Sequence, residues 1–187
     1  TYNMENYDFV GIGDITTDAF IRLEEPGAHC DIDNDNLEIC MSFGDKIPYE
    51  FVDVVRAVGN SPNASVCASR LGLNVALVSN LGTDRNGDEC IDVLKTENIS
   101  TKWVDKHTDK ETNYHYVLWF EDDRTILIKH HDYDRHFPDI GNPKWVYLSS
   151  IGKNTEKYHN EIADYLEIRP DIKVAFQPGT YQIALGA

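Results

Sequence analysis

Short apolar runs that alternate with helical stretches are the feature of this sequence that most restricts its fold. Val75 to Val78 has the composition of a buried strand, and a helical stretch follows from about Gly87 to Glu97, with Ile91 and Leu94 on one side. An alternation of strands and helices is typical of a parallel sheet that helices cover. The sequence therefore predicts an α/β fold with a mostly parallel central sheet.

The same alternation extends toward both ends of the chain. Ser61 is expected to cap a helix that Pro62 opens and Gly72 closes, because Pro has no N–H to leave unpaired at the first position. Another helix is expected from about Thr155 to Glu167. Further strands are expected from Tyr7 to Ile12, Trp145 to Leu148 and Lys173 to Phe176. Nothing after Pro178 and Gly179 is predicted to form a closing element.

The middle of the chain lacks this alternation. Tyr114 to Phe120 and Thr125 to Lys129 flank an acidic turn and predict a β-hairpin. Leu37 to Phe43 and Phe51 to Val55 are expected to be short strands, and the acidic stretch from Glu24 to Asn36 an exposed excursion. These segments predict β-structure outside the α/β pattern.

The balance of charge excludes one class of partner. The 187 residues include 17 Lys and Arg against 32 Asp and Glu, which gives a formal net charge of −15. Such a surface repels a phosphate backbone, and the sequence holds no concentrated basic stripe to offset it. We therefore expect no nucleic-acid partner, and most of the acidity is expected only to favour solubility. The length suits one α/β domain or one large piece of a bigger one.

Localisation is predicted from apolar runs and cysteines. No apolar run approaches the roughly 18 to 20 residues that a membrane helix needs, so no membrane partner is expected. The polar start lacks the basic and apolar parts of a signal peptide. Cys30, Cys40, Cys67 and Cys90 are scattered and are expected to be reduced thiols. A cytoplasmic protein is predicted.

The turn after the first strand is a candidate ligand site. Asp14 and Asp18 follow that strand, and ligands of open α/β sheets bind beyond the carboxyl ends of the strands. Two carboxylates at this place suit a polyol that they hold through its hydroxyls. The alternative is that both residues only cap turns, as Asp often does.

A second candidate site is Gly59-Asn60-Ser61-Pro62-Asn63, at the start of the predicted helix. Gly59 lets a ligand approach the backbone, and Asn63 lies in the first turn, where backbone donors point outward. Asn both donates and accepts hydrogen bonds, which suits a sugar hydroxyl. An ordinary capped helix start is the alternative. A Walker phosphate loop is excluded, because the Gly-Lys-Ser/Thr ending is missing.

Two other polar segments are given structural roles. Asp84 is expected to tie together the turn from Gly82 to Gly87. A later cluster of histidines and carboxylates has the residue types that bind zinc, but its spacing matches no tetrahedral template. We therefore predict a solvated loop there and no metal site. The cluster comprises His130, His131, Asp132, Asp134 and His136.

Taken in this order, the motifs resemble the N-terminal signature of the PfkB, or ribokinase-like, family of carbohydrate and nucleoside kinases. The resemblance rests on Gly13-Asp14 with Asp18 beyond, on Gly59-Asn60-Ser61-Pro62-Asn63-Ala64-Ser65 running to Arg70-Leu71-Gly72, and on Gly82-Thr83-Asp84-Arg85-Asn86-Gly87. It spans the whole chain, which looks like the N-terminal part of the family's domain. It implies one incomplete three-layer αβα domain over residues 1–187, without the C-terminal part of the fold. A small β-sheet lid is implied at about residues 19–55 and 113–130.

The resemblance also implies an acceptor site. Asp18 matches the family's carboxylate that holds hydroxyls of the acceptor sugar, with Asp14 beside it. Gly59, Asn60 and Asn63 match the loop that contacts the same sugar. The lid would exclude water, which otherwise hydrolyses a phosphoryl donor. In this family the lid often makes the dimer contact, which implies a homodimer through the lid strands.

Two departures from the family's pattern bear on activity. Val58 stands where a second glycine is usual, which narrows the expected sugar pocket. The family's Asp-Thr-x-Gly-Ala-Gly-Asp run is absent, and that run supplies the general base and a helix N-terminus for the transferring phosphate. The base and most of the site for ATP and Mg²⁺ are therefore expected beyond Ala187. A chain without these groups is expected to transfer phosphate poorly or not at all.

The expected function is ATP-dependent phosphorylation of a sugar or nucleoside hydroxyl by the parent protein from which this chain comes. The chain would supply the acceptor half of the site and the lid. The alternatives are a non-catalytic sugar-binding protein and a dimerisation module built on the lid strands. Ribose, fructose, other sugars and adenosine-like nucleosides stay open as acceptors, because lid side chains decide among them. Oligomeric state and monovalent-ion dependence stay open too.

Overall fold

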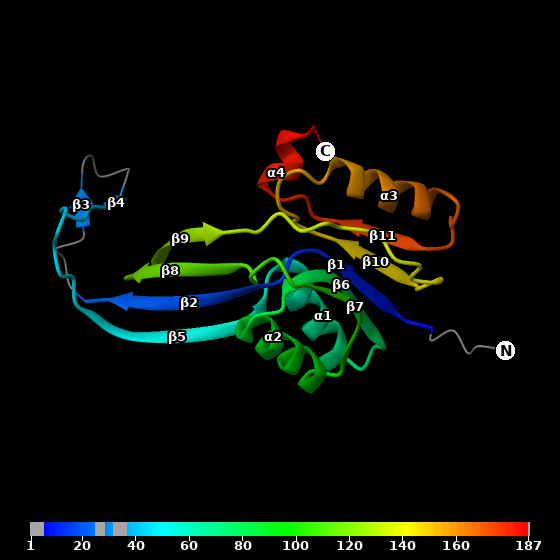
Figure 1. The fold of residues 1–187 in the computed structure, drawn as a ribbon, viewed down its shortest axis with the longest axis horizontal. Helices are drawn as coiled ribbons and strands as arrows, with labels where there is room; N and C mark the ends of the chain where they lie inside the picture. The colour runs from blue at the N-terminus through cyan, green and yellow to red at the C-terminus, as the bar shows by residue number, and fades with distance from the viewer. Residues whose placement is uncertain (1–5, 25–28, 32–36, 187) are drawn as a thin grey trace. The chain divides into compact units, whose positions relative to one another are not determined.

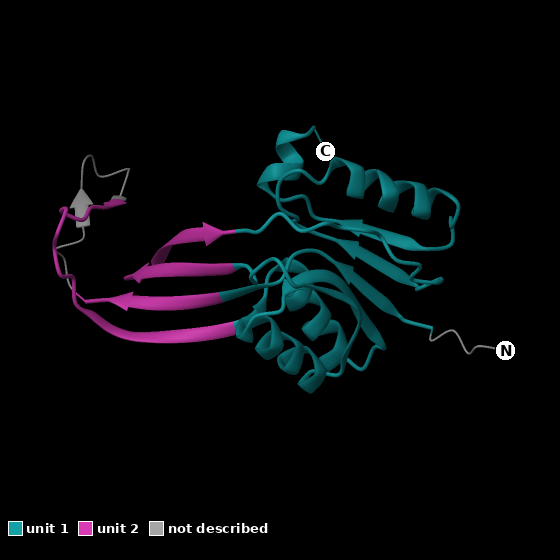
Figure 2. Ribbon diagram, viewed as in Figure 1, with its two compact units in different colours: residues 1–17, 56–113, 130–187 teal, residues 18–55, 114–129 magenta. Residues whose placement is uncertain are grey.

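The computed structural model describes residues 6–24, 29–31 and 37–186, and they divide into two compact units. The first unit comprises residues 1–17, 56–113 and 130–187, and the second comprises residues 18–55 and 114–129 (Figure 2). Strands β2 (Thr16–Leu23) and β5 (Tyr49–Val58) each have residues in both units. No helix within the described residues is long and apolar enough to cross a membrane.

A five-stranded parallel sheet forms the centre of the first unit. Its strand order is β11-β10-β1-β6-β7, and every neighbouring pair is parallel. Parallel neighbours require crossover connections, which the helices between the strands provide. The strands are β1 (Phe9–Ile12), β6 (Val75–Gly82), β7 (Ile99–His107), β10 (Trp145–Leu148) and β11 (Lys173–Phe176).

Helices cover both faces of this sheet. Figure 1 shows α1 and α2 on one face and α3 on the other. The packing agrees, because the core cluster on the α3 face contains Val10, while the cluster on the other face contains Leu77 and Leu94. The first unit therefore has three layers, and the predicted αβα fold class is confirmed. The helices are α1 (Asn60–Arg70), α2 (Arg85–Thr96), α3 (Glu156–Glu167) and α4 (Thr180–Ala184).

The two ends of the strand order differ in burial. Strand β6 lies inside the sheet, and each of its eight residues is buried. Strand β11 lies at one end of the order, and among the described residues no strand pairs with its outer edge. Its side chains Val174 and Phe176 are 47% and 45% exposed. The open edge of the sheet therefore carries apolar side chains.

The second unit is a four-stranded sheet with the order β5-β2-β8-β9. Strands β8 (Tyr114–Phe120) and β9 (Asp123–Lys129) form the predicted antiparallel hairpin, with Glu121 at a positive φ of 47° in its turn. A separate antiparallel pair is formed by β3 (His29–Asp31) and β4 (Leu37–Ile39). Every residue of β9 is exposed.

Several expectations need correction. Strand β7 and helix α4 were not predicted, β2 begins at Thr16 where lid strands were expected from about residue 19, and β4 ends at Ile39 where a strand to Phe43 was expected. Ser61 lies inside α1, whose N-cap is Gly59, and the Ser61 hydroxyl instead donates to the carbonyl of Ile12 at 2.7 Å. The predicted excursion from Glu24 to Asn36 lies mostly outside the described residues, as does the side chain of Cys30. Cys67 and Cys90 are free thiols.

The turn from Gly82 to Gly87 has the predicted structural role. Asp84 is the N-cap of α2, and its Oδ1 accepts a hydrogen bond from the Gly87 N–H at 3.0 Å. The same oxygen accepts one from the Thr112 hydroxyl at 2.5 Å. Burial alone would raise the pKa of Asp84, but these hydrogen bonds outweigh it and lower the pKa. The carboxylate therefore joins the start of α2 to the segment that leads into β8.

Candidate functional site

The carboxyl ends of β1 and β10 bring together segments that lie far apart in the sequence. The N–H of Asp14, just after β1, donates to the carbonyl of Ser150, just after β10, at 3.2 Å. The Gly152 N–H donates in turn to Asp14 Oδ2 at 2.8 Å. Because the two strands are parallel neighbours, these turns meet at one edge of the sheet, where open α/β sheets bind ligands.

Asp14 is the centre of a buried charge cluster at this edge. Arg135 Nη2 lies 2.7 Å from Asp14 Oδ1, and His130 Nδ1 lies 3.7 Å from Oδ2. The side chains of Asp14 and Arg135 are only 7% and 5% exposed. Two opposite charges taken out of water stabilise each other only at such close range.

The surroundings of Asp14 favour its ionised form. Burial would raise the pKa of this carboxyl, but His130, the Arg135 charge and the Gly152 N–H together lower it below the ordinary value. Despite its 2.7 Å separation, the Asp14–Arg135 contact lacks the alignment of a hydrogen bond. Asp14 Oδ1 and Arg135 Nε are both buried without a hydrogen-bond partner among the described residues.

Arg135 is a site residue that the sequence analysis missed. It lies in the segment from His130 to His136, which was expected to be a solvated loop. That expectation is wrong at Tyr133 and Arg135, which are buried, and right at Asp132 and Asp134, which are exposed. The one signal in the sequence for this burial is Tyr133, a large ring between two acidic residues. Within the described part of the chain, no three His, Cys, Asp or Glu residues could hold a metal ion.

The loop before α1 reaches the same edge. Gly59 has a φ of 128°, in the region that favours glycine, and a Cβ there would stand 2.7 Å from the carbonyl oxygen of Asp14. Asn60 and Asn63 follow in the first turn of α1, and both are exposed. The structure therefore brings Asp14 and Gly59 together, with two exposed amides close by in the sequence.

Asp18 belongs to the second unit. Its Oδ1 is 3.1 Å from His115 Nδ1, on the neighbouring strand β8. The convergence of Asp18 with Asn63 on one ligand stays a prediction.

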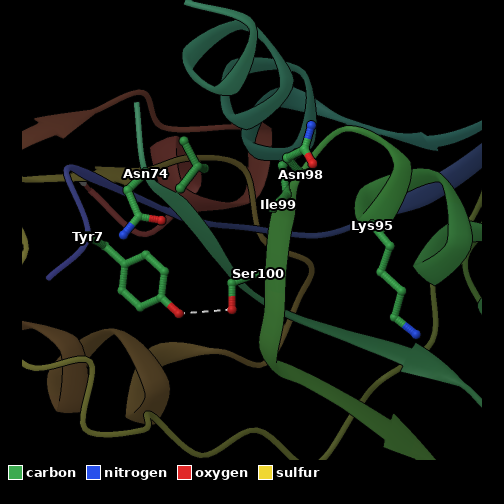
Figure 3. A pocket seen from close by; sticks show the side chains of 7 residues that line it. Tyr7, Asn74, Lys95, Asn98, Ile99 and Ser100 are labelled. Carbon is green, nitrogen blue, oxygen red and sulfur yellow. Dashed lines mark hydrogen bonds between the residues drawn. The ribbon is translucent and has the colours of Figure 1, made fainter. Parts of the chain in front are cut away.

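A separate pocket of about 420 Å³ opens at the other end of the strands (Figure 3). It lies where β6 and β7 begin, and the Tyr7 hydroxyl donates across it to Ser100 Oγ at 2.9 Å. Because ligands of such sheets bind at the carboxyl ends, we do not assign the acceptor to this pocket. The lining residues are Tyr7, Asn74, Val75, Lys95, Asn98, Ile99 and Ser100.

Replacing Arg135 with Met tests the charge cluster. The change keeps much of the side-chain volume but leaves the Asp14 carboxylate buried without its guanidinium. We expect the free energy of unfolding to fall by about 3–5 kcal/mol. Chemical denaturation measures this loss. Arg85→Met is the control, because Arg85 makes an exposed ion pair with Glu89 and its loss should matter little. Equal effects of the two changes would contradict the cluster's role.

Acidification tests the charge state of Asp14. Its pKa is lowered in the folded state, so its contribution to stability is present above the unfolded value of about 3.9 and is lost as the pH falls through the folded value. Asp14→Asn removes this titration. We expect the variant to be less stable than the original chain at neutral pH but to lose less stability below about pH 4. Parallel denaturation curves across this range check it, and identical pH slopes would contradict it.

Comparisons with known proteins agree with the fold. The family described as pfkB family carbohydrate kinase matches residues 34–167. No curated protein matches the chain significantly. Among solved structures, Arabidopsis thaliana ribokinase complexed with ribose and ATP has a TM-score of 0.70 at 16% identity, over 91% of this chain and 53% of that one.

Two other solved structures are similar over the same extent. Halothermothrix orenii fructokinase has a TM-score of 0.66 at 27% identity, over 90% of this chain and 56% of that one. The Methanocaldococcus jannaschii nucleoside kinase has a TM-score of 0.67 at 15% identity, over 94% of this chain and 54% of that one. The chain thus spans about half the length of the structures it matches. It belongs to the pfkB family of carbohydrate kinases.

Proposed function

We propose that the parent protein transfers the γ-phosphate of ATP to a hydroxyl of a sugar or nucleoside, and that this chain supplies the acceptor half of the site. Membership of the pfkB family supports a kinase of this class. The observation that carries the assignment of this half is the meeting of Asp14 and Gly59 at the carboxyl edge of the sheet. This is the edge at which an open α/β sheet binds its ligand.

In this proposal the residues divide into binding and supporting groups. Asp18 accepts hydrogen bonds from acceptor hydroxyls, because an ionised carboxylate has only acceptors to offer. The amides of Asn60 and Asn63 both donate and accept, which matches a hydroxyl. Asp14, held by Arg135 and Gly152, stands beside the acceptor and keeps the loop after β1 in place. Positioning of this kind is a large part of phosphoryl-transfer catalysis.

We assign no contact with ATP or Mg²⁺ to the described residues. Among them no group of three or more His, Cys, Asp or Glu residues could hold a metal ion, and the sequence has no Walker loop. We therefore route no step through the nucleotide and assign its contacts, and the general base, to parts of the protein beyond this chain. The chain alone is expected to bind acceptor without turnover.

A homodimer through the second unit is the other part of the proposal. Its strands leave large apolar side chains in contact with solvent, and contiguous apolar surface often marks an interface. A second copy of the same sheet would cover them by pairing like surfaces. A dimerisation module without catalysis is the alternative function that this surface favours. The exposed residues include Tyr49, Phe51, Val52, Val55, Ile126, Leu127 and Ile128.

An ATP-consumption assay with a panel of sugars and nucleosides tests the kinase function on the full gene product. We expect turnover with at least one acceptor, and we expect Asp18→Asn to lower kcat/KM for it by about 100-fold, because a charged hydrogen-bond acceptor is lost. Asp53→Asn, an exposed carboxylate on β5, is the control and should leave turnover unchanged. Turnover with no acceptor would refute the kinase, and calorimetric binding without turnover would favour the non-catalytic alternative.

Sedimentation equilibrium tests the homodimer. Leu127 is 52% exposed on β9, and Leu127→Lys would place a charge in the interface. We expect the original protein to sediment as a dimer and the variant to dissociate at least tenfold more readily. Thr96→Lys, which adds the same charge on α2, should have no effect. A monomeric original protein would exclude this dimer.

A further inference from the structure

A histidine stands beside Asp18 within the second unit. His115 is the second residue of β8, and β8 lies next to β2, which carries Asp18. His115 Nδ1 is 3.1 Å from Asp18 Oδ1, and the two side chains are 12% and 18% exposed. On the other side of β8, His115 is paired with Ile128, which offers no charge. Within the described residues, an imidazole therefore lies directly against the Asp18 carboxylate.

His115 and Asp18 lie at a hydrogen-bond distance but are not aligned as a hydrogen bond. The distance of 3.1 Å is a normal hydrogen-bond length for nitrogen and oxygen. The alignment is not that of a hydrogen bond, and Asp18 Oδ1 is a buried atom without a hydrogen-bond partner among the described residues. A buried acceptor in this state is costly, and an imidazole nitrogen lies within hydrogen-bond distance of it.

We propose that His115 is a positioning residue for Asp18, which it holds by one carboxylate oxygen so that the other faces the hydroxyl of the acceptor. This inference rests on the proposed function, because Asp18 is the carboxylate assigned to the acceptor. A carboxylate turns easily about its last side-chain bond, so a fixed donor on one oxygen selects one orientation. An imidazole N–H donates a single hydrogen bond, so it can hold one carboxylate oxygen and leave the other to the acceptor hydroxyl.

The choice of histidine fits this role better than a permanent cation would. Lys or Arg at position 115 would pair with Asp18 through a full charge and compete with the acceptor for both oxygens. Asp14 shows the contrast in the same chain, since it is paired with Arg135 and further held by Gly152. Asp18 lies 3.1 Å from an imidazole nitrogen, whereas Asp14 lies 2.7 Å from a guanidinium nitrogen. In this proposal the two carboxylates therefore have different tasks, and the difference lies in their partners, Arg135 for Asp14 and His115 for Asp18.

Two variants of nearly equal shape test the proposal in the full gene product. His115→Asn keeps an N–H close to the position of Nδ1, whereas His115→Leu has similar branching and no donor. We expect His115→Leu to raise the KM for the acceptor at least tenfold while kcat and the KM for ATP change less than twofold. His115→Asn is expected to restore most of the lost affinity. Tyr116→Leu, at the next position on β8 and pointing to the opposite face, is the control.

A double-variant cycle gives the second readout. If His115 acts through Asp18, His115→Leu has no further effect on the acceptor KM in an Asp18→Asn background. Full additivity, or equal behaviour of His115→Leu and His115→Asn, would overturn the proposal.

The unfolding midpoints of the same four proteins test the pair without any acceptor. We expect the shifts caused by the two single changes to be non-additive in the double variant. If no acceptor is phosphorylated, the proposed function fails, and the midpoints still decide on the pair. Additive midpoints would overturn the positioning role whatever the enzyme does.

Discussion

The buried pairing of Asp14 with Arg135 is the interaction on which the carboxyl edge of the sheet depends. It joins the turn after β1 to the segment that leads from β9 to β10, and Gly152 adds the turn after β10. Burying a charge without its partner costs far more free energy than burying the pair. Separation of Asp14 from Arg135 is therefore strongly unfavourable, and the pair keeps the segments together. The close approach of Gly59 to the same turn then brings the start of α1 to this edge.

Much of the first unit could be predicted from sequence, because short local patterns of apolar residues identify its strands and helices. The apolar runs of β1, β6, β10 and β11 mark strands, and α1, α2 and α3 show one-sided apolar patterns. Strand β7 was missed because it lies at the other end of the strand order, where its exposed positions carry polar side chains such as Lys102 and Asp105. The short helix α4 has too few residues to show a periodic pattern.

The candidate site was predictable in its parts but not in its pairing. The motifs after β1 and before α1 could be recognised from their Asp, Gly and Asn residues. The structure brings Asp14 and Gly59 together. Arg135 could not be assigned, because its partner is far away in sequence and a loop arginine next to an aspartate normally lies in solvent. The same limit applies to His115, whose meaning appears only once β8 is seen beside β2.

The outer edge of β11 has a practical consequence for handling this chain. Its backbone N–H and C=O groups have no strand partner among the described residues, and Val174 and Phe176 beside them are partly exposed. An uncovered strand edge with apolar side chains is a template for edge-to-edge association between molecules. Expressed by itself, the chain is therefore prone to aggregate through this edge despite its net charge of −15, and a lysine in place of Val174 is the natural solubilising change.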